Sequence, residues 1–357
     1  MPRAKNMPRA KTLVTVFGLA FASAVISCGA RTADNNAAPP PSNENAAGGL
    51  EVQRSKTAKP VGTIHLPGNG GFTDYMVISP ETHRLYAGYR TENTLFVVDT
   101  LNNNVVASIG GLSKVCSVAL VPEIKLGFTS NRGDDTLGVI DLTTNKLLRK
   151  IPGGHGPDAI IYNPVAKVVC VSNHEGRGIT LVDVSTEKHI TIPLGGLAEY
   201  VQADPNTGII YQNLEDSSEV AVIDPKKNAV IARYKTAPGA EPTGLALDAE
   251  HRRLFVACGN QKLVVLDADN GKVITTLPIG AGVDFAAYDA ALRRIYTANG
   301  GSGTMTVIHQ DSPDQYSVLE NVPTHRGGHA LAIDPGTHRI YVTYGGSEIA
   351  VYEAVTP

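Results

Sequence analysis

Short apolar runs recur along the chain, and most of them end in an aspartate. LFVVD is the first, followed by LGVID, ITLVD, VAVID and LVVLD, and then by MTVIH with a histidine in the same place. The final residues are Asp99, Asp141, Asp183, Asp224, Asp267 and His309, which are spaced by 42, 42, 41, 43 and 42 residues. Apolar runs bounded by turn residues are typical of buried strands, so this period indicates a repeat of strands.

A second marker follows the same period. It is a turn with Pro or Asp followed by an apolar segment, as in SPETHRLYAGY, NPVAKVVCVSN and DPGTHRIYVTY, and the chain contains seven copies. Seven units of about forty residues are characteristic of a β-propeller. We therefore predict an all-β fold, a seven-bladed β-propeller.

Each unit divides into four strands, A to D, from the innermost to the outermost. In the second unit these strands are CSVALV, KLGFTS, TLGVID and KLLRKIP. The aspartate that opens the C–D turn can accept backbone N–H groups, which favours a structural role for it. The last unit ends at YEAVTP without a strand D, whereas residues 61–67, VGTIHLP, have the strand-D pattern and no preceding A, B or C. We expect four-stranded antiparallel blades over residues 60–357, with the N-terminal strand completing the last blade and removing its open edge.

The repeat V-x-V-I-D-x-x-T/N-x-K-V-x-x-x-I-P, with an apolar or aromatic second strand, resembles the YVTN-type β-propeller repeat of bacterial and archaeal envelope proteins. The resemblance covers residues 61–353. It implies the propeller fold and leaves the function open, because that family includes surface proteins and binding proteins. The chain has no Trp, unlike tryptophan-docked propellers with a quinone cofactor and unlike ordinary WD repeats. It also has no C-x-x-C-H and no G-x-S-x-G motif.

The N-terminus is typical of an exported protein. A basic start is followed by TLVTVFGLAFASAVIS, an uncharged apolar stretch that is short for a membrane span, so residues 1–27 are expected to be a signal peptide. Val-Ile-Ser-Cys28 resembles a lipoprotein signal, in which Cys28 is lipidated and becomes the first residue. Cleavage near Ala24 or Ala30, with Cys28 incidental, is the alternative. We expect a cell-envelope protein, periplasmic or anchored to the outer membrane.

The composition of the chain limits the classes of partner that we expect it to bind. Residues 28–59 are rich in Ala, Pro, Asn and Gly without an apolar period, which predicts a flexible tether. Removal of residues 1–27 changes the formal charge from −3 to −7, which argues against nucleic acid as a partner. We expect a monomer that contacts the membrane through its lipid anchor only. Cys116, Cys170 and Cys258 lie in apolar runs and are expected to be buried free thiols.

The loops on one face of the propeller vary in sequence and are polar, which makes that face the candidate for function. These are the D–A and B–C connections, whereas the A–B and C–D turns on the opposite face are nearly uniform. The D–A loops place one polar residue near the start of each innermost strand, where the residues would surround the mouth of the central channel. They are Asp74, Lys114, Asp158, Glu199, Glu241, Asp284 and His329.

The ends of the B strands add a second ring. Its members are Tyr89, Asn131, Asn173, Asn213, Cys258, Asn299 and Tyr344. Turn chemistry explains repeated Asn in part, because Asn tolerates left-handed backbone. Alternatively, amide and carboxylate oxygens converge on a divalent, calcium-like cation. Its candidate ligands are Glu199, Asp284, Asn131, Asn213 and Asn299.

Histidines form the last candidate group. His174 in SNHEGRG does not recur in the repeat, so the fold does not require it, and it serves either a ligand or solubility. His155 and His329 lie on D–A loops, closer to the innermost strand, and are expected to be better placed than His174.

Two functions from different classes remain. The preferred one is a non-enzymatic scaffold that binds a small ligand or an envelope protein through the polar face. The alternative is a metal-dependent hydrolase resembling a lactonase, with one divalent cation at the channel mouth that polarises a carbonyl and lowers the pKa of water. The catalytic residues of such an enzyme cannot be named from the sequence.

Overall fold

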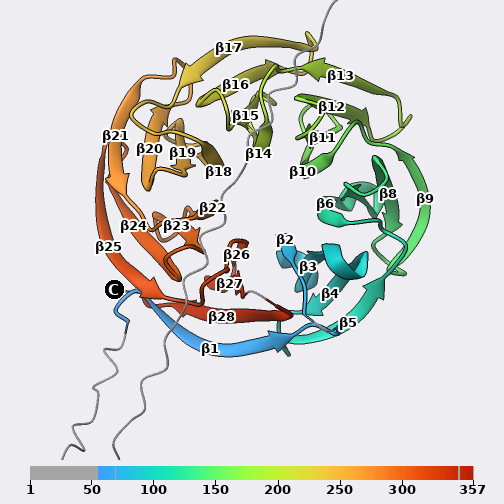
Figure 1. The fold of residues 1–357 in the computed structure, drawn as a ribbon, viewed down its shortest axis with the longest axis horizontal. Helices are drawn as coiled ribbons and strands as arrows, with labels where there is room; N and C mark the ends of the chain where they lie inside the picture. Colours follow the sequence, from blue (N-terminus) through green and yellow to red (C-terminus); the bar gives the residue numbers. More distant parts are fainter. Residues whose placement is uncertain (1–54, 69, 345, 357) are drawn as a thin grey trace, which may run out of the picture. The chain divides into compact units, whose positions relative to one another are not determined.

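Residues 55–68, 70–344 and 346–356 form a ring of seven four-stranded antiparallel sheets in a computed structural model of the chain (Figure 1). The strands of six blades follow one another in sequence order, and the seventh blade has the order β1-β28-β27-β26. The predicted seven-bladed propeller is therefore confirmed, and so is its closure by an N-terminal strand. The proposed signal peptide, Cys28 and most of the proposed tether lie outside the described residues.

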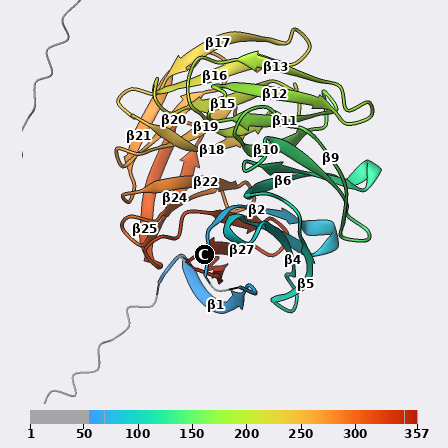
Figure 2. The same ribbon diagram turned by 45° about the vertical axis from the view of Figure 1, so that its right-hand side comes forward.

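The innermost strands surround the central channel in Figures 1 and 2, and the fourth strands form the rim. Blades 1 to 3 contain β2 (Thr73–Ser79), β3 (Arg84–Tyr89), β4 (Thr94–Asp99), β5 (Asn104–Ile109), β6 (Val115–Val121), β7 (Leu126–Asn131), β8 (Thr136–Asp141), β9 (Lys146–Pro152), β10 (Pro157–Asn163), β11 (Val168–Asn173), β12 (Gly178–Asp183) and β13 (His189–Pro193). Blades 4 and 5 contain β14 (Ala198–Ala203), β15 (Ile210–Leu214), β16 (Glu219–Asp224), β17 (Ala229–Lys235), β18 (Pro242–Asp248), β19 (Arg253–Cys258), β20 (Lys262–Asp267) and β21 (Val273–Pro278). Blades 6 and 7 contain β22 (Val283–Asp289), β23 (Arg294–Asn299), β24 (Thr304–Ser312), β25 (Gln315–Pro323), β26 (Leu331–Asp334), β27 (Arg339–Thr343), β28 (Glu348–Ala354) and β1 (Ala58–His65). Three short 3₁₀ helices occupy turns, namely η1 (Pro80–Thr82), η2 (Arg90–Glu92) and η3 (Pro122–Ile124).

The closing strand is longer at its start than the sequence pattern indicates. β1 begins at Ala58, inside the stretch expected to be a tether, and pairs with β28 from Ala58↔Ala354 to His65↔Glu348. The residues before it are also fixed, since Glu320 Oε2 accepts bonds from the Ser55 and Thr57 hydroxyls at 2.9 and 2.7 Å. A local pattern could not reveal these bonds, because they join residues more than 260 positions apart.

The C–D turns confirm the structural role of the recurring aspartates. Asp99, Asp141 and Asp183 each accept backbone N–H groups two and three residues ahead through one carboxylate oxygen. At Asp183 the neighbouring Ser185 and Thr186 also donate, and these bonds lower the pKa of its carboxyl to about 2.

Apolar clusters fill the space between neighbouring blades. One cluster joins Phe128 and Val139 of blade 2 to Ile160 and Val171 of blade 3, and all four side chains are buried. The alternation along each strand therefore places one face against the preceding blade and the other against the next. Cys116, Cys170 and Cys258 are buried free thiols, as the sequence predicts.

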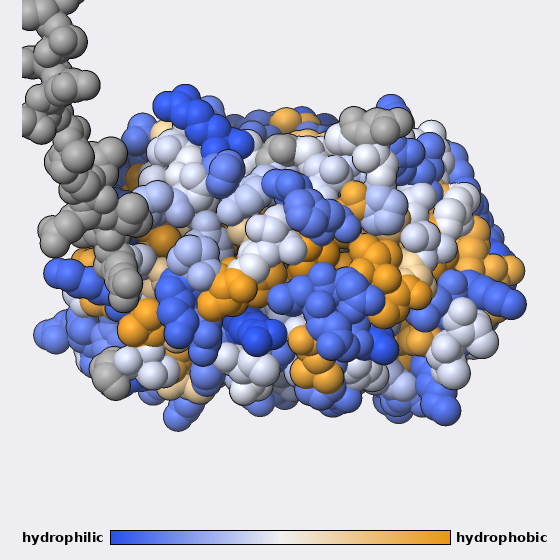
Figure 3. Space-filling view, turned by 90° about the horizontal axis from the view of Figure 1, so that it is seen from below, coloured by the Kyte–Doolittle hydropathy of each residue, from blue (hydrophilic) through white to orange (hydrophobic). Residues whose placement is uncertain are grey.

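Apolar side chains also reach the rim. Val106, Leu148, Ile190 and Ile231 are exposed on the fourth strands of blades 1 to 4, and Val61 is exposed on β1. Figure 3 shows hydrophobic side chains exposed along the middle of one side of the rim. In the part of the chain that the structure describes, there is no helix with the length and apolar character needed to cross a membrane.

Closure of the ring predicts a large effect of one buried side chain. Ile64 of β1 is fully buried in the apolar cluster between blades 7 and 1, whereas Val61 on the same strand is 41% exposed. We expect Ile64→Ala to lower the free energy of unfolding by about 2–5 kcal/mol, because it leaves a cavity in the core, and Val61→Ala to change it by less than about 0.5 kcal/mol. Denaturant unfolding followed by circular dichroism measures both. Equal effects of the two substitutions would show that β1 does not contribute to the core.

Candidate functional site

β-Bulges interrupt the innermost strand in six blades, at one level near the end where the strand begins. In blade 3, Pro157 pairs with Asn173 and Ile160 with Val171, so Asp158 and Ala159 together face a single partner residue. Blades 1, 4 and 5 show the same irregularity, whereas in blades 2 and 6 a single residue, Cys116 or Asp284, is inserted without a partner opposite it. A bulge re-aims the side chains that it contains. Gly88 permits the close packing of one bulge, since a Cβ there would lie 2.3 Å from the Cys116 carbonyl oxygen.

The first residues of the six bulges occupy equivalent positions, and we call this set the inner ring. It consists of Asp74, Cys116, Asp158, Glu199, Thr243 and Asp284. Four of the residues that the sequence singles out therefore share one level. Lys114 and Glu241 do not, because they lie two residues earlier in exposed turns with φ of 47° and 55°. The sequence analysis missed Cys116 and Thr243, although counting back from the apolar part of each strand would have aligned them.

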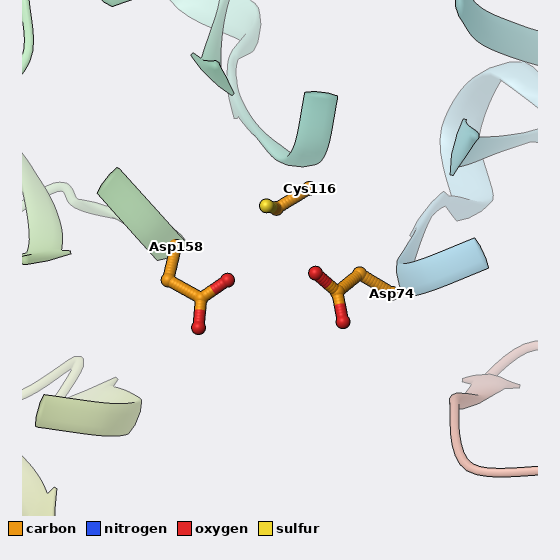
Figure 4. A group of neighbouring side chains, drawn as sticks. All are labelled: Asp74, Cys116 and Asp158. Carbon is orange, nitrogen blue, oxygen red and sulfur yellow. The ribbon is translucent and has the colours of Figure 1, made fainter. Parts of the chain in front are cut away.

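Three inner-ring side chains from consecutive blades point toward one another. Ligand atoms of Asp74, Cys116 and Asp158 lie within 4.8 Å of each other (Figure 4). Two arginines balance the carboxylates: Arg90 Nη1 lies 2.8 Å from Asp74 Oδ2, and Arg132 Nη1 lies 3.3 Å from Asp158 Oδ2. Burial and the carboxylates raise the pKa of the Cys116 thiol, which keeps it protonated.

A second group shares Asp158 and adds a histidine. Ligand atoms of Asp158, His174 and Glu199 also lie within 4.8 Å of one another. His174 Nδ1 is 2.8 Å from Glu199 Oε1, and this carboxylate raises the pKa of the imidazole. An imidazole and two carboxylates are a donor set that suits a metal ion or an organic cation.

The basic members of this site also occupy equivalent positions. Arg90, Arg132 and His174 each follow the last residue of the second strand in blades 1, 2 and 3. Arg90 pairs within its own blade, whereas Arg132 and His174 reach the acid of the next blade. The sequence alone does not show which carboxylates these residues face, because the contacts of Arg132 and His174 cross from one blade to the next.

The acids of the inner ring ionise less readily than isolated carboxylates. Desolvation is the largest cause, and it raises the pKa of Asp158 and of Asp284 to about 6, with a further increase from neighbouring acids. Burial also raises the pKa of Asp74 and Glu199, against the opposing effects of Arg90 and His174. Although water reaches Asp284, protein atoms and other acids surround it closely. The mouth of the channel is therefore a site that an added positive charge would stabilise.

The structure exchanges the expected places of His155 and His174, whereas His329 lies close enough to Asp74 and Asp284 to lower their pKa values. His155 is exposed, and its Nδ1 lies 2.9 Å from Asp135, outside the two groups of neighbouring ligand atoms. His174, expected to lie farther out, belongs to the second group. His329 stacks on Phe72 with ring centroids 4.1 Å apart, and its Nδ1–H donates to the Gly327 carbonyl at 2.8 Å. This bond leaves the shielded Nε2 of His329 without a partner.

The asparagines at the ends of the second strands have packing roles. Asn131 Oδ1 accepts the Thr129 hydroxyl at 2.9 Å, and Asn299 Oδ1 accepts the Thr297 hydroxyl at 2.9 Å. Asn173 Nδ2 donates to the Thr180 hydroxyl at 2.6 Å. All of these side chains are buried. These bonds favour the structural interpretation of the asparagine ring.

Asn213 does not occupy the same position as the other asparagines. Leu214, not Asn213, pairs with Ala198 at the place where Asn173 pairs with Pro157. The Nδ2 of Asn213 instead donates to the carbonyls of Thr243 and Gly244 in the next blade, at 3.0 Å each. Asn213 therefore lies one residue before the position of Asn173, and an alignment by residue type shifts this strand by one residue.

Three aromatic rings meet directly beside the inner ring. Tyr75, Tyr200 and Phe285 follow Asp74, Glu199 and Asp284 in sequence, and they come from blades 1, 4 and 6. Their ring centroids are 5.6, 6.2 and 4.7 Å apart. Side chains from these three blades can contact one another only at the axis of the propeller. The three aromatic rings therefore fill the channel at this level.

A cavity of about 600 Å³ lies on the other side of the aromatic rings. Tyr200 and Phe285 form one end, apolar residues of the innermost strands such as Val77 and Ile161 form the wall, and Pro122 marks the turns at the open end. This cavity opens on the A–B turn face, opposite the acidic residues. No pattern in the sequence indicates this cavity.

Comparison with known proteins identifies the fold. No protein-family model and no curated protein sequence matches the chain. The WD40 repeats of RRP9 superpose with a TM-score of 0.71 at 9% identity, covering 82% of this chain and 97% of that one. U3-55K gives a TM-score of 0.71 at 10% identity over 82% and 98% of the two chains. Hydrazine synthase of Kuenenia stuttgartiensis gives 0.69 at 16% identity over 79% and 95%.

These similarities show a β-propeller fold that resembles WD40 propellers and nothing finer, because the identities are low. The chain is therefore a seven-bladed β-propeller. Its resemblance to YVTN repeats remains a prediction.

The raised pKa of Asp284 gives a pH dependence of defined sign. Between about pH 4 and pH 6 the folded protein retains a proton that the unfolded chain has lost, so the free energy of unfolding falls as the pH rises. We expect Asp284→Asn to remove part of this fall and to raise stability at neutral pH by up to ~1 kcal/mol, since water around the carboxylate reduces the full effect.

Denaturant unfolding at several pH values tests this expectation. Glu241→Gln, in an exposed turn, is the matched control and should leave the profile unchanged. A profile for Asp284→Asn that parallels the native one would contradict the raised pKa.

Proposed function

We propose that this propeller is a ligand-binding scaffold of the cell envelope, which binds a small positively charged ligand or a cationic segment of an envelope protein at the mouth of its channel. The main support for this proposal is that four acids surround the mouth of the channel and that their carboxyl groups all have raised pKa values. They are Asp74, Asp158, Glu199 and Asp284. Repulsion and desolvation make such a cluster unfavourable by itself. A bound cation would relieve both effects.

The residues beneath the carboxylates support the same chemistry. Tyr75, Tyr200 and Phe285 provide ring faces and an apolar floor beside the acids. An ammonium group between carboxylates and aromatic rings gains ion-pair and cation–π interactions together. Arg90 and Arg132 accompany Asp74 and Asp158, whereas the cations that lower the pKa of Glu199 and Asp284 are histidines, His174 and His329.

Binding of simple amines tests the proposal. Isothermal titration with putrescine and choline should show binding that weakens with salt, whereas succinate should not bind. Asp284→Asn should weaken amine binding by about 10-fold through loss of one nearby charge. Glu241→Gln should leave it unchanged, because that carboxylate lies in an exposed turn. Equal affinity for amines and succinate would refute a cation-binding mouth.

Export and lipidation are part of the same proposal. The basic start, the short apolar stretch and the Val-Ile-Ser-Cys28 sequence support a lipid-anchored monomer in the periplasm or at the outer membrane. Residues from Cys28 to the first bonded residue, Ser55, would then form the connection to the membrane. The charge of the chain after residue 27 makes nucleic acid a poor partner.

Mass spectrometry of a native membrane fraction tests the anchor. We expect the mature chain to begin at a lipid-modified Cys28, and Cys28→Ser to release it from the membrane fraction. Recovery of an unmodified soluble chain beginning near Arg31 would show that ordinary signal-peptide cleavage operates instead.

The second candidate is metal-dependent hydrolysis, and one observation favours it. Asp158, His174 and Glu199 bring three ligand atoms together, which is the number of protein ligands in many catalytic zinc sites. A metal held there would polarise a carbonyl and activate water. Hydrolysis of γ-lactones by metal-loaded protein, absent after treatment with a chelator, would support this function over simple binding.

A further inference from the structure

We infer that Asp158, His174 and Glu199 form a binding site for one divalent transition-metal ion, with Zn²⁺ as the best fit. This inference deepens the proposed function and rests on it, because it names a cation that the channel mouth binds. It differs from the calcium-like ion with asparagine ligands that the sequence offers as an alternative to turn chemistry.

The spacing of the three side chains fits a single small ion. Their ligand atoms all lie within 4.8 Å of one another, and His174 Nδ1 and Glu199 Oε1 are 2.8 Å apart. Ligand atoms bound to a tetrahedral zinc ion at about 2.0–2.1 Å are about 3.3 Å from each other. Small rotations of the side chains are therefore enough to place all three on one ion.

One buried atom of this group is unsatisfied, and it points to a missing ligand. Asp158 is only 4% exposed, and Arg132 Nη1 approaches its Oδ2 at 3.3 Å. The other oxygen, Oδ1, is shielded from water and has no hydrogen-bond partner in the described structure. His174 Nδ1 is also shielded and lies 2.8 Å from the Glu199 carboxylate. A buried oxygen such as Asp158 Oδ1 is seldom left without a partner, and one ion would bind this oxygen, the imidazole and Glu199 together.

The backbone holds the ligands in place before any ion arrives. Asp158 and Glu199 lie in the bulges of β10 and β14, on adjacent blades. The N–H of His174 donates to the Gly156 carbonyl at 2.9 Å, which ties the histidine to the start of the strand that carries Asp158. Ligands on rigid elements lose little entropy when they bind, which favours affinity.

The donor set selects the class of ion. Calcium takes six to eight oxygens, whereas one imidazole nitrogen with two carboxylates suits zinc and its neighbours in the transition series. The neighbouring group of Asp74, Cys116 and Asp158 is less suitable. Arg90 already pairs with Asp74, and the Cys116 thiol would have to lose a proton that its acidic surroundings retain.

Metal titration of the full chain tests the site. We expect metal-free protein to bind one Zn²⁺ by isothermal titration, and Co²⁺ to give the intense visible absorption of tetrahedral coordination. His174→Ala should lower the affinity for Zn²⁺ by about 100-fold or more, because it removes the only nitrogen ligand. His155→Ala is the matched control, since His155 lies on a neighbouring loop of the same blade outside the group, and it should bind Zn²⁺ like the native chain.

Each outcome decides the inference. The metal site is wrong if His174→Ala binds Zn²⁺ as tightly as the native chain, or if the native chain binds neither Zn²⁺ nor Co²⁺. If the native chain binds putrescine but no metal, the proposed function stands and the metal site does not. If the native chain binds neither putrescine nor a metal, the proposed function and the metal site are both wrong. Circular dichroism monitors folding, and Glu199→Gln, which keeps the shape of the side chain, provides a second ligand variant should His174→Ala fail to fold.

Discussion

Pairing of β1 with β28 is the interaction on which the rest of the structure depends. It joins residues near the two ends of the described chain, covers the last open sheet edge and completes the apolar packing between blades 7 and 1. A ring closed in this way fixes the distance of every innermost strand from the axis. Residues from blades 1, 3, 4 and 6 can therefore meet in the channel although they are far apart in sequence. Glu320 extends the closure, because it binds Ser55 and Thr57 ahead of the strand.

The bulges convert this geometry into a site. A regular strand would direct alternate residues into the blade interfaces, but the bulges of blades 1 and 4 bring both members of the pairs Asp74–Tyr75 and Glu199–Tyr200 toward the channel. Acids and aromatic rings thus form two adjacent layers. Tight contacts support the arrangement, as at Gly88, where no side chain fits against the Cys116 carbonyl.

The electrostatic balance of the mouth is uneven around the ring. Arg90, Arg132 and His174 accompany the acids of blades 1, 3 and 4, whereas the equivalent positions beside blade 6 are glycines, such as Gly300. Near Asp284 the cation that lowers the pKa of the carboxyl is His329 and not an arginine. Among the acids of the inner ring, Asp158 has a buried oxygen without a hydrogen-bond partner in the described part of the chain. The aromatic layer separates this charged half of the channel from the cavity behind it, whose lining combines apolar side chains with Gln202 and Glu81. The two faces of one ring consequently present different chemistry.

The amino-acid sequence by itself determined the number of blades, the strand that closes the ring and the role of the turn aspartates. These features follow from periodicity and from bonds between residues two or three positions apart, which a sequence displays directly. Tertiary structure decided which polar residues reach the axis. Lys114 and Glu241 were expected there, but the bulges place Cys116 and Thr243 at that level, and Asn213 faces the next blade because it lies one residue before the end of its strand. The contacts of His174 with Glu199 and of Arg132 with Asp158 cross from one blade to the next. Such contacts depend on strand register and on the packing of whole blades, which no local pattern of residues encodes.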